Sequence, residues 1–174
     1  MSFDEFAARH LPALLRYAAV LTGNRDLAQD IVQEVLVRVH ARWSGIGGLD
    51  RPEQYVRRMI TNEFLSWRRR WGRVLPFAEV TPTPAPGAPP DLATAHADRD
   101  ALLAELARLP RRQQVVLVLR YYEGLTDQEI ADVLGCRPGT VRGYASRALR
   151  SLRISVADTP TPSIAKEIFD AYRA

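Results

Sequence analysis

Residues 126–153 read TDQEIADVLGCRPGTVRGYASRALRSLR, and no other stretch of the chain is as informative about structure. Thr126 and Glu129 have the spacing of a capping box, which predicts that a helix begins here. Gly135 is placed to end that helix in the left-handed conformation, and Pro138 is placed in the first turn of the next helix. A helix, a short glycine-containing turn and a second helix form the unit that lays its second helix in the DNA major groove. The stretch therefore predicts a helix-turn-helix.

The second of these helices has two distinct faces. Its apolar residues recur at helical spacing: Val141, Ala145, Ala148, Leu149 and Leu152. The opposite face carries basic, small and polar residues: Arg142, Gly143, Ser146, Arg147, Arg150 and Arg153. A solvated surface helix usually mixes both signs of charge, but no acidic residue occurs between positions 137 and 153. Arginine is the commonest specific partner of guanine, and the hydroxyls of Thr140 and Ser146 can contact phosphate or base. We therefore predict that this part of the chain binds DNA.

An acidic helix and an arginine-rich helix are predicted in the N-terminal part. Asp30, Gln33 and Glu34 fall on one helical face, opposite an apolar stripe, and most faces of this kind are simply solvated. Farther along, arginines alternate with aromatic residues: Arg57, Arg58, Arg68, Arg69, Arg70 and Arg73 with Tyr55, Phe64, Trp67 and Trp71. Arginines that follow a backbone and rings that stack on bases suit single-stranded nucleic acid. Tyr55 and Phe64 are expected in the core, whereas Trp67 and Trp71 bracket the arginines.

Proline divides the chain. Six of the 12 prolines lie between residues 76 and 90, where they exclude a helix and predict an extended linker. We expect a helical domain over residues 1–75, the linker over 76–97, a second helical domain over 98–156 and a tail over 157–174. Both domains are net basic, and strand patterns are absent. The predicted fold class is all-α, with two small helical domains joined by a proline-rich linker.

Caps, glycines and prolines predict the other helices. Their expected ranges are 3–21, from Asn24 to the glycines at 45–48, 52–70, 101–109 and 110–122. Pro12 is expected to break the first of these helices. Asn24 and Pro52 favour helix starts, and Gly124 is expected to close the last helix.

The composition excludes several classes of protein. The 174 residues carry a formal net charge of +4, and 23 of the 24 basic residues are arginine. Recognition of phosphate and guanine explains this preference, and so does the codon bias of a GC-rich genome. The single cysteine, Cys136, excludes a disulfide framework and a cysteine-rich zinc site. The histidines are scattered and no acidic cluster has metal-ligand spacing, so we predict no catalytic residue, no metal and no cofactor.

The sequence also indicates where the protein acts. No stretch approaches 18 uninterrupted apolar residues, so we expect no insertion into a membrane. Met1 is not followed by a basic stretch and a short apolar core, so we expect no secretory signal. The predicted location is the cytoplasm.

Taken in order, these stretches resemble the sigma-70 family of RNA polymerase sigma factors, in its small extracytoplasmic-function (ECF) subgroup of actinobacterial type. The resemblance covers residues 3–153, and its motifs are specific through their order and spacing. Residues 26–34 resemble the helix of sigma region 2 that docks on the polymerase, and residues 51–59 and 62–70 resemble the part that opens and reads the −10 element. Four stretches resemble sigma region 4: residues 109–113, 121–126, 129–131 and 139–142.

The resemblance implies a role for each matching residue. Asp30, Gln33 and Glu34 would contact the clamp helices of the largest subunit of core RNA polymerase. Asn62 and the loop at residues 44–49 would capture a flipped base of the −10 element. The residues near the separated strands would be Arg57, Arg58, Trp67 and Arg68. The −35 element would be read by Arg142, Ser146 and Arg147, assisted by Arg137, Thr140 and Gly143.

The resemblance also implies the partners, and this chain departs from the family at two places. The partners would be core RNA polymerase, including the flap of its second-largest subunit, promoter DNA and, as a further candidate, an anti-sigma factor. Arg137 stands where the family often has a capping serine, so its side chain cannot accept the capping hydrogen bond. Gly143 and Tyr144 replace a more common polar and basic pair, which leaves the −35 specificity open.

Two alternatives stay open on the residues alone. A free-standing helix-turn-helix regulator would bind a specific operator without polymerase and would usually be a dimer. A small recombinase or nuclease would need a nucleophile or metal-binding carboxylates. In the tail, Ser163 could cap a short amphipathic helix that either packs on its own domain or regulates the protein.

Overall fold

The computed structural model describes residues 1–71 and 104–155, and within them the side chains of residues 1–66 and 104–152. All regular elements in these ranges are helices, as the predicted all-α fold class requires. The predicted linker, the tail and the side chains of Trp67, Arg68, Trp71 and Arg153 lie outside this description. The chain divides into two compact units, Met1–Val74 and Leu75–Ala174, and each is described by itself.

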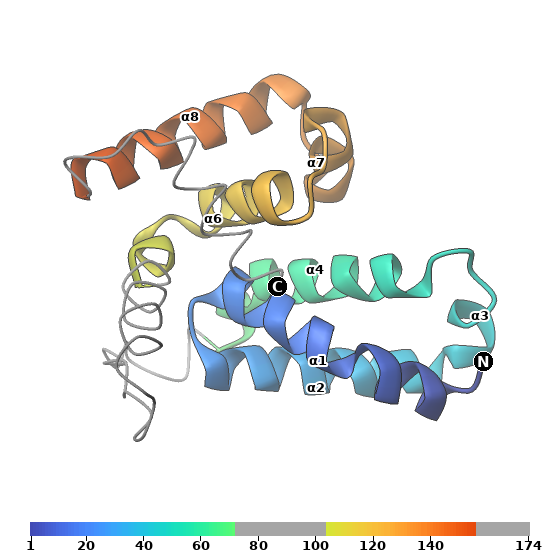
Figure 1. Cartoon of the computed structure of the whole chain (residues 1–174). Helices are drawn as coiled ribbons and strands as arrows, with labels where there is room; N and C mark the ends of the chain where they lie inside the picture. Colours follow the sequence, from blue (N-terminus) through green and yellow to red (C-terminus); the bar gives the residue numbers. More distant parts are fainter. Residues whose placement is uncertain (72–103, 156–174) are drawn as a thin grey trace, which may run out of the picture. The chain divides into compact units, whose positions relative to one another are not determined.

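Three long helices build the first unit: α1 (Phe3–Thr22), α2 (Arg25–Ala41) and α4 (Pro52–Trp71). Each contacts the other two, and the short helix α3 (Trp43–Ile46) follows α2 (Figure 1). Their apolar stripes meet in a core that includes Phe6, Ile31 and Ile60, all at most 1% exposed. The Tyr17 hydroxyl and the Thr61 hydroxyl share a buried hydrogen bond of 2.6 Å, which links α1 to α4. The expected start of α2 is confirmed, because the Asn24 side chain accepts a hydrogen bond of 2.8 Å from the Leu27 amide.

The predicted break at Pro12 is wrong, because α1 runs through it. A proline inside a helix costs about 3 kcal/mol or more. Burial explains why the helix continues, since Phe6 lies before Pro12 and Leu14 and Tyr17 lie after it, all fully buried. Pro12 itself is exposed, so its ring needs no space in the core.

Two further expectations for the first unit are wrong. Tyr55 is 42% exposed, whereas Phe64 is buried as predicted. The buried face of α4 repeats every four residues through Val56, Ile60 and Phe64, and Tyr55 lies one position away from it. The loop expected at residues 44–49 begins inside α3, whose Ile46 is buried.

The second unit is a compact group of helices that ends in the predicted helix-turn-helix. Residues 104–108 are helical, and α6 (Arg111–Leu117) continues into a π-helical turn, η1 (Val118–Tyr122). Helix α7 (Asp127–Leu134) and helix α8 (Pro138–Ser155) follow, and α8 packs against both α6 and α7 (Figure 1). The core contains Val115–Leu119, Ile130 and the apolar face of α8.

The turn residues of the helix-turn-helix behave as predicted. The Thr126 side chain accepts from the Glu129 amide at 3.3 Å, and the Glu129 carboxylate accepts from the Thr126 amide at 2.8 Å. Gly135 ends α7 with a φ of 61°, in the left-handed region that favours glycine. Gly124 likewise has a φ of 71° after η1. These features place α7 and α8 on either side of a three-residue turn.

Candidate nucleic-acid interface

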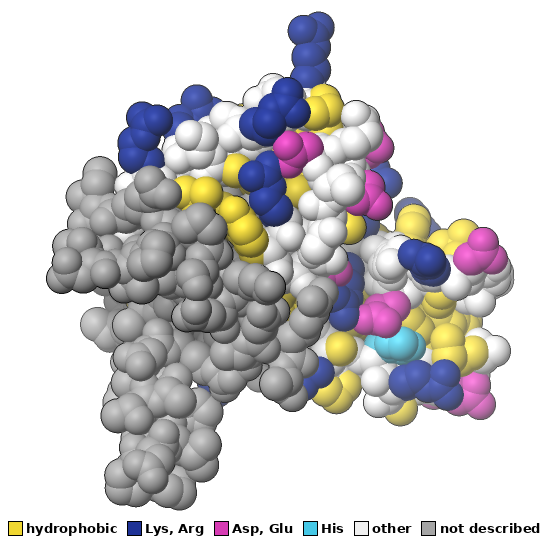
Figure 2. Space-filling view, turned by 45° about the horizontal axis from the view of Figure 1, so that its top comes forward, with side chains coloured by type: hydrophobic (Ala, Val, Ile, Leu, Met, Phe, Trp, Pro, Cys, Tyr) yellow, Lys and Arg dark blue, Asp and Glu magenta, His cyan; other side chains and the backbone are white. Residues whose placement is uncertain are grey.

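Helix α8 buries one face and exposes the other, as its sequence predicts. Val141, Ala145, Ala148 and Leu152 are at most 9% exposed, and Leu149 is half-buried. The exposed residues of the other face are Arg142, Ser146, Arg147 and Arg150. In Figure 2 a group of dark blue basic side chains lies over the region that Figure 1 labels α8. The helix therefore presents cations and small polar groups while its apolar residues anchor it.

The N-terminal end of α8 holds three more predicted contact residues. The Arg137 carbonyl accepts hydrogen bonds from the amides of Thr140 (2.8 Å) and Val141 (3.3 Å), so its backbone caps the helix. Its side chain is exposed, whereas Thr140 is half-buried. Gly143 is also half-buried, and a Cβ at this position would lie 3.8 Å from Nη2 of Arg147.

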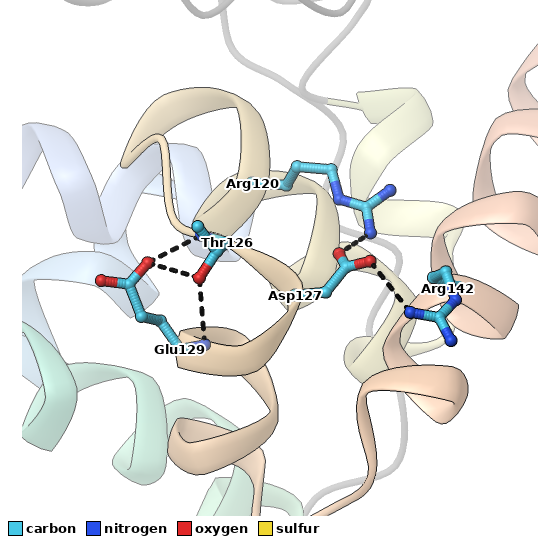
Figure 3. A network of polar contacts seen from close by, with 5 residues as sticks. All are labelled: Arg120, Thr126, Asp127, Glu129 and Arg142. Carbon is cyan, nitrogen blue, oxygen red and sulfur yellow. Dashed lines mark hydrogen bonds and ion pairs between the residues drawn. The ribbon is translucent and has the colours of Figure 1, made fainter.

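An acidic residue lies beside one of these cations. Oδ2 of Asp127 lies 3.8 Å from Nη1 of Arg142, and Oδ1 of the same carboxylate accepts a hydrogen bond from Nη2 of Arg120 (Figure 3). Asp127 is the first residue of α7, so the contact joins the two helices of the helix-turn-helix. A carboxylate at a helix N-terminus is also stabilised by the helix dipole.

Tyr144 lies next to Arg147. The guanidinium carbon of Arg147 is 5.3 Å from the centre of the Tyr144 ring, which is a cation–π distance. Tyr144 is half-buried and Arg147 is exposed, so the ring lies against a guanidinium group that solvent can reach. Tyr144 was not among the predicted contact residues, although its departure from the family pattern was a signal.

The predicted polymerase-binding residues share one exposed face of α2. Asp30, Gln33 and Glu34 are all exposed, while the opposite face buries Ile31, Val32, Val35 and Val39. Val37 lies three residues after Glu34, on the same side, and is 69% exposed. Its exposure places an apolar group within a polar face. Because Val37 has no place in the buried repeat, the sequence could have indicated it.

Arg38 lies at the edge of the exposed α2 face and is held there by two carboxylates. Its Nη2 lies 2.5 Å from Oε2 of the buried Glu63 on α4, and its Nε lies 3.8 Å from Oε1 of Glu34. Arg38 therefore links α2 to α4 and stands beside Glu34. The Glu34 side chain remains 55% exposed, so a partner can reach it.

The structure separates the predicted −10 residues on α4. Arg58 and Asn62 are exposed and lie one helical turn apart, and Tyr55 lies on the same side. Arg57 faces inward: its Nη2 is 2.6 Å from Oε1 of Glu53, and its guanidinium lies 5.5 Å from the centre of the Tyr17 ring. Arg57 is therefore partly buried and ties α4 to α1.

The pKa of Glu129 clearly departs from its ordinary value. The hydrogen bond from the Thr126 amide, followed by that from the Thr126 hydroxyl, lowers the pKa of its carboxyl below 4.5. This shift belongs to the helix cap and not to a reaction centre. Within residues 1–71 and 104–155, no group of three His, Cys, Asp or Glu side chains could hold a metal ion. No helix among those residues is long and apolar enough to cross a bilayer.

These features define a class of protein: a helix-turn-helix nucleic-acid-binding protein with a second, separate helical unit. Two family descriptions match it, "Sigma-70 region 2" at residues 6–74 and "Sigma-70, region 4" at residues 99–152. The "RNA polymerase sigma-E factor" of Streptomyces avermitilis is 37% identical over 154 residues, which are 88% of this chain and 84% of that protein. The "ECF RNA polymerase sigma factor SigL" of Mycobacterium tuberculosis is 34% identical over 161 residues, or 90% of this chain and 87% of that protein. The chain belongs to the sigma-70 family of RNA polymerase sigma factors, in the ECF subgroup.

A solved structure shares the fold. The sigma factor RpoE of Bartonella quintana, solved in complex with the anti-sigma factor NepR, matches with a TM-score of 0.68 and 24% identity. The match covers 91% of this chain and 98% of RpoE. At this identity the similarity establishes the fold alone.

Family membership establishes what the protein does. It is a sigma factor that binds core RNA polymerase and promoter DNA and directs promoter recognition and transcription initiation. The resemblance of the sequence motifs to the sigma-70 family is thereby confirmed.

Proposed function

We propose that the two units divide the work of initiation between two exposed helical faces. The face of α2 formed by Asp30, Gln33, Glu34 and Val37 binds the clamp helices of the largest polymerase subunit. The exposed face of α8 reads the −35 element, and the second unit also contacts the flap of the second-largest subunit. The observation that carries this proposal is the contrast between an acidic, polar face in one unit and an acid-free, arginine-rich face in the other.

The arginine face suits duplex DNA. Arg142 and Arg147 lie five residues apart on the solvent side of α8, and Ser146 lies between them. A bidentate arginine contact to guanine is worth about 1–3 kcal/mol of discrimination. Arg137 and Thr140, at the start of the helix, are placed for phosphate contacts, which position the helix on the duplex.

The exposed side of α4 suits the separated strands of the −10 element. Tyr55, Arg58 and Asn62 offer a ring, a cation and an amide on one face. A ring that stacks on an unpaired base contributes about 1–3 kcal/mol, which is comparable to the few kcal/mol that flipping a base costs. Trp67 and Arg68 follow on this helix, and we propose that they also act near the separated strands. Arg57 supports this helix from inside through Glu53 and Tyr17.

The same proposal includes what the protein does not do. Catalysis belongs to the polymerase, and this chain has no reaction chemistry of its own and needs no cofactor. Its work is done in the cytoplasm, where the polymerase transcribes. The proposed segments are 1–75 for core and −10 binding, 98–156 for −35 binding, 76–97 as the linker and 157–174 as a tail.

An anti-sigma factor is the remaining partner in the proposal. The support is that RpoE, which shares the fold, was solved with the anti-sigma factor NepR. A protein that covers the α2 face, with its exposed Val37, would compete with the polymerase for the same residues.

The division of work is tested with two matched pairs of variants. Gln33→Lys changes the α2 face, and Gln54→Lys makes the same change at an exposed position of α4. We expect Q33K to weaken binding to core RNA polymerase by about tenfold or more, because it places a cation among groups that meet the polymerase. Q54K should leave core affinity within about twofold.

The second pair addresses DNA. Arg147→Ala should leave core affinity unchanged and lower run-off transcription by about five- to 150-fold on a promoter that has its −35 element. Arg112→Ala removes an exposed arginine from α6 and serves as the control. Loss of core binding in R147A, or loss of only promoter binding in Q33K, would contradict the division.

A further inference from the structure

Asp127 connects arginines from two neighbouring elements through one carboxylate. Arg120 comes from η1 and contacts Oδ1, and Arg142 comes from α8 and lies 3.8 Å from Oδ2 (Figure 3). The other acid drawn there, Glu129, is held by Thr126 and does not enter this contact. The carboxylate of Asp127 is thus the acidic group that faces the proposed −35 arginine.

The three side chains differ in exposure. Arg120 and Asp127 are 25% and 27% exposed, whereas Arg142 is 66% exposed. The Arg120–Asp127 pair is therefore the partly buried anchor, and Arg142 is the member that solvent or DNA can reach. The capping box formed by Thr126 and Glu129 fixes the first turn of α7, so the backbone of Asp127 is also fixed.

A fixed carboxylate changes what an arginine can bind. The guanidinium has five donors, and Asp127 lies next to Nη1, which leaves other donors for a second acceptor. The pair limits the rotamers of a long side chain, and its negative charge disfavours phosphate at the same place. A base edge, which is neutral, is not repelled in this way.

We propose that Asp127 is a positioning residue. It orients the Arg142 side chain toward a base edge and disfavours contact of this side chain with the DNA backbone. The proposal rests on the assignment of α8 to the −35 element. It makes Asp127 a determinant of −35 specificity although it lies on the first helix of the helix-turn-helix.

The measurement that separates positioning of Arg142 from a simple effect of charge is the preference for particular bases, and not the overall affinity for DNA. Any variant that removes an acid near DNA strengthens binding to phosphate, whatever its structural role. Only a residue that positions Arg142 changes the preference at the base positions that Arg142 reads.

The experiment uses the complete holoenzyme, with core RNA polymerase and the full chain, on a promoter library randomised in the −35 element. Bound and unbound fractions are sequenced for wild type, Arg142→Ala, Asp127→Ala, Asp127→Asn and the double variant D127A/R142A. We expect R142A to lose the preference at one or two positions. D127A and D127N should lower the base preference at the same positions by about two- to tenfold. The double variant should have the same preference as R142A.

Asp132→Asn is the matched control, because it removes the same charge from the exposed side of the same helix. It should leave the base preference unchanged. D127N keeps the size of the side chain, so it serves if D127A lowers the stability of the fold.

Four results overturn the inference. The first is an unchanged preference in both Asp127 variants while R142A loses it. The second is a loss in D127A that is as large in the R142A background as in the wild type. The third is a loss of the same size in D132N. The fourth is that R142A itself leaves every −35 preference intact, because Arg142 then reads no base. That result leaves open the assignment of α8 to the −35 element, which Arg147→Ala tests separately.

Discussion

At the residue scale, Gly135 is the position on which the geometry of the helix-turn-helix depends. Its φ of 61° lies in the left-handed region, where a Cβ meets the following carbonyl oxygen. Apart from its two chain neighbours, no residue has a heavy atom within 4 Å of a Cβ built there, so we expect backbone strain to set the cost of a substitution. We expect Gly135→Ala to lower the free energy of unfolding by about 1–2 kcal/mol.

Urea denaturation of the full chain, followed by helical circular dichroism, measures this cost. The control is Gly139→Ala, because Gly139 lies in the first turn of α8 without a positive φ, and its nearest neighbour would be 3.8 Å away. G139A should be neutral or slightly stabilising, since alanine favours helix. A midpoint for G135A at or above the wild-type midpoint would show that the turn does not need the left-handed conformation.

Single residues also show how far the sequence predicts the site. The exposed cations of α8 follow from a period of 3.6 residues, because an anchored helix must turn its other face outward. Asp127 could not be assigned in this way, because its contact with Arg142 depends on how α7 and α8 cross. Arg57 shows the opposite limit: its sequence context is basic, yet Glu53 and Tyr17 hold it inward.

At the element scale, the start of α7 depends on an ionised carboxylate. Hydrogen bonds from the Thr126 amide and hydroxyl lower the pKa of Glu129 below its ordinary 4.5. A carboxyl whose pKa is lower in the folded state stabilises the fold above its unfolded pKa. That contribution is lost as the pH falls through the lowered folded value.

The comparison of wild type with Glu129→Gln checks this linkage. We expect the wild type to be the more stable protein at pH 6 to 7, and the difference to shrink as the pH falls below about 4.5. Thermal unfolding at several pH values measures it, and Gln128→Ala, at an exposed neighbour of the same turn, is the control. A stability difference that stays constant down to pH 3 would mean that the charge of Glu129 does not contribute.

Helix ends were more predictable than helix interiors. The residue types at Asn24, Thr126 and Gly135 predict helix caps from the local sequence alone. Each of these caps is present in the structure. The continuity of α1 through Pro12 and the π-helical turn at Val118–Tyr122 are set by burial that local propensity does not include. In η1 the Glu123 amide donates to the Val118 carbonyl at 3.2 Å, five residues back, while Val118, Leu119 and Tyr122 are buried.

At the scale of the whole molecule, the protein combines two units of different surface chemistry. The first exposes acidic and polar groups on α2, and the second exposes arginines on α8. We expect neither face to give high specificity by itself, because each presents only a few side chains for direct contact. Binding of both units through one polymerase makes the second contact intramolecular and raises its effective concentration.

This coupling predicts that specificity belongs to the holoenzyme. The free chain should bind duplex DNA weakly and with strong salt dependence, and should prefer its promoter over a scrambled sequence by less than about tenfold. In the holoenzyme the same preference should reach about 10³-fold, as in other specific complexes. Competition binding with both DNAs at two salt concentrations measures the two ratios, and R147A serves in both series as the variant in which we expect a weakened −35 contact.

A free chain that prefers its promoter by about 10³-fold, and does so as a dimer, would identify a regulator that recognises an operator without polymerase. A large preference in the holoenzyme alone places the source of specificity in the joint attachment of both units.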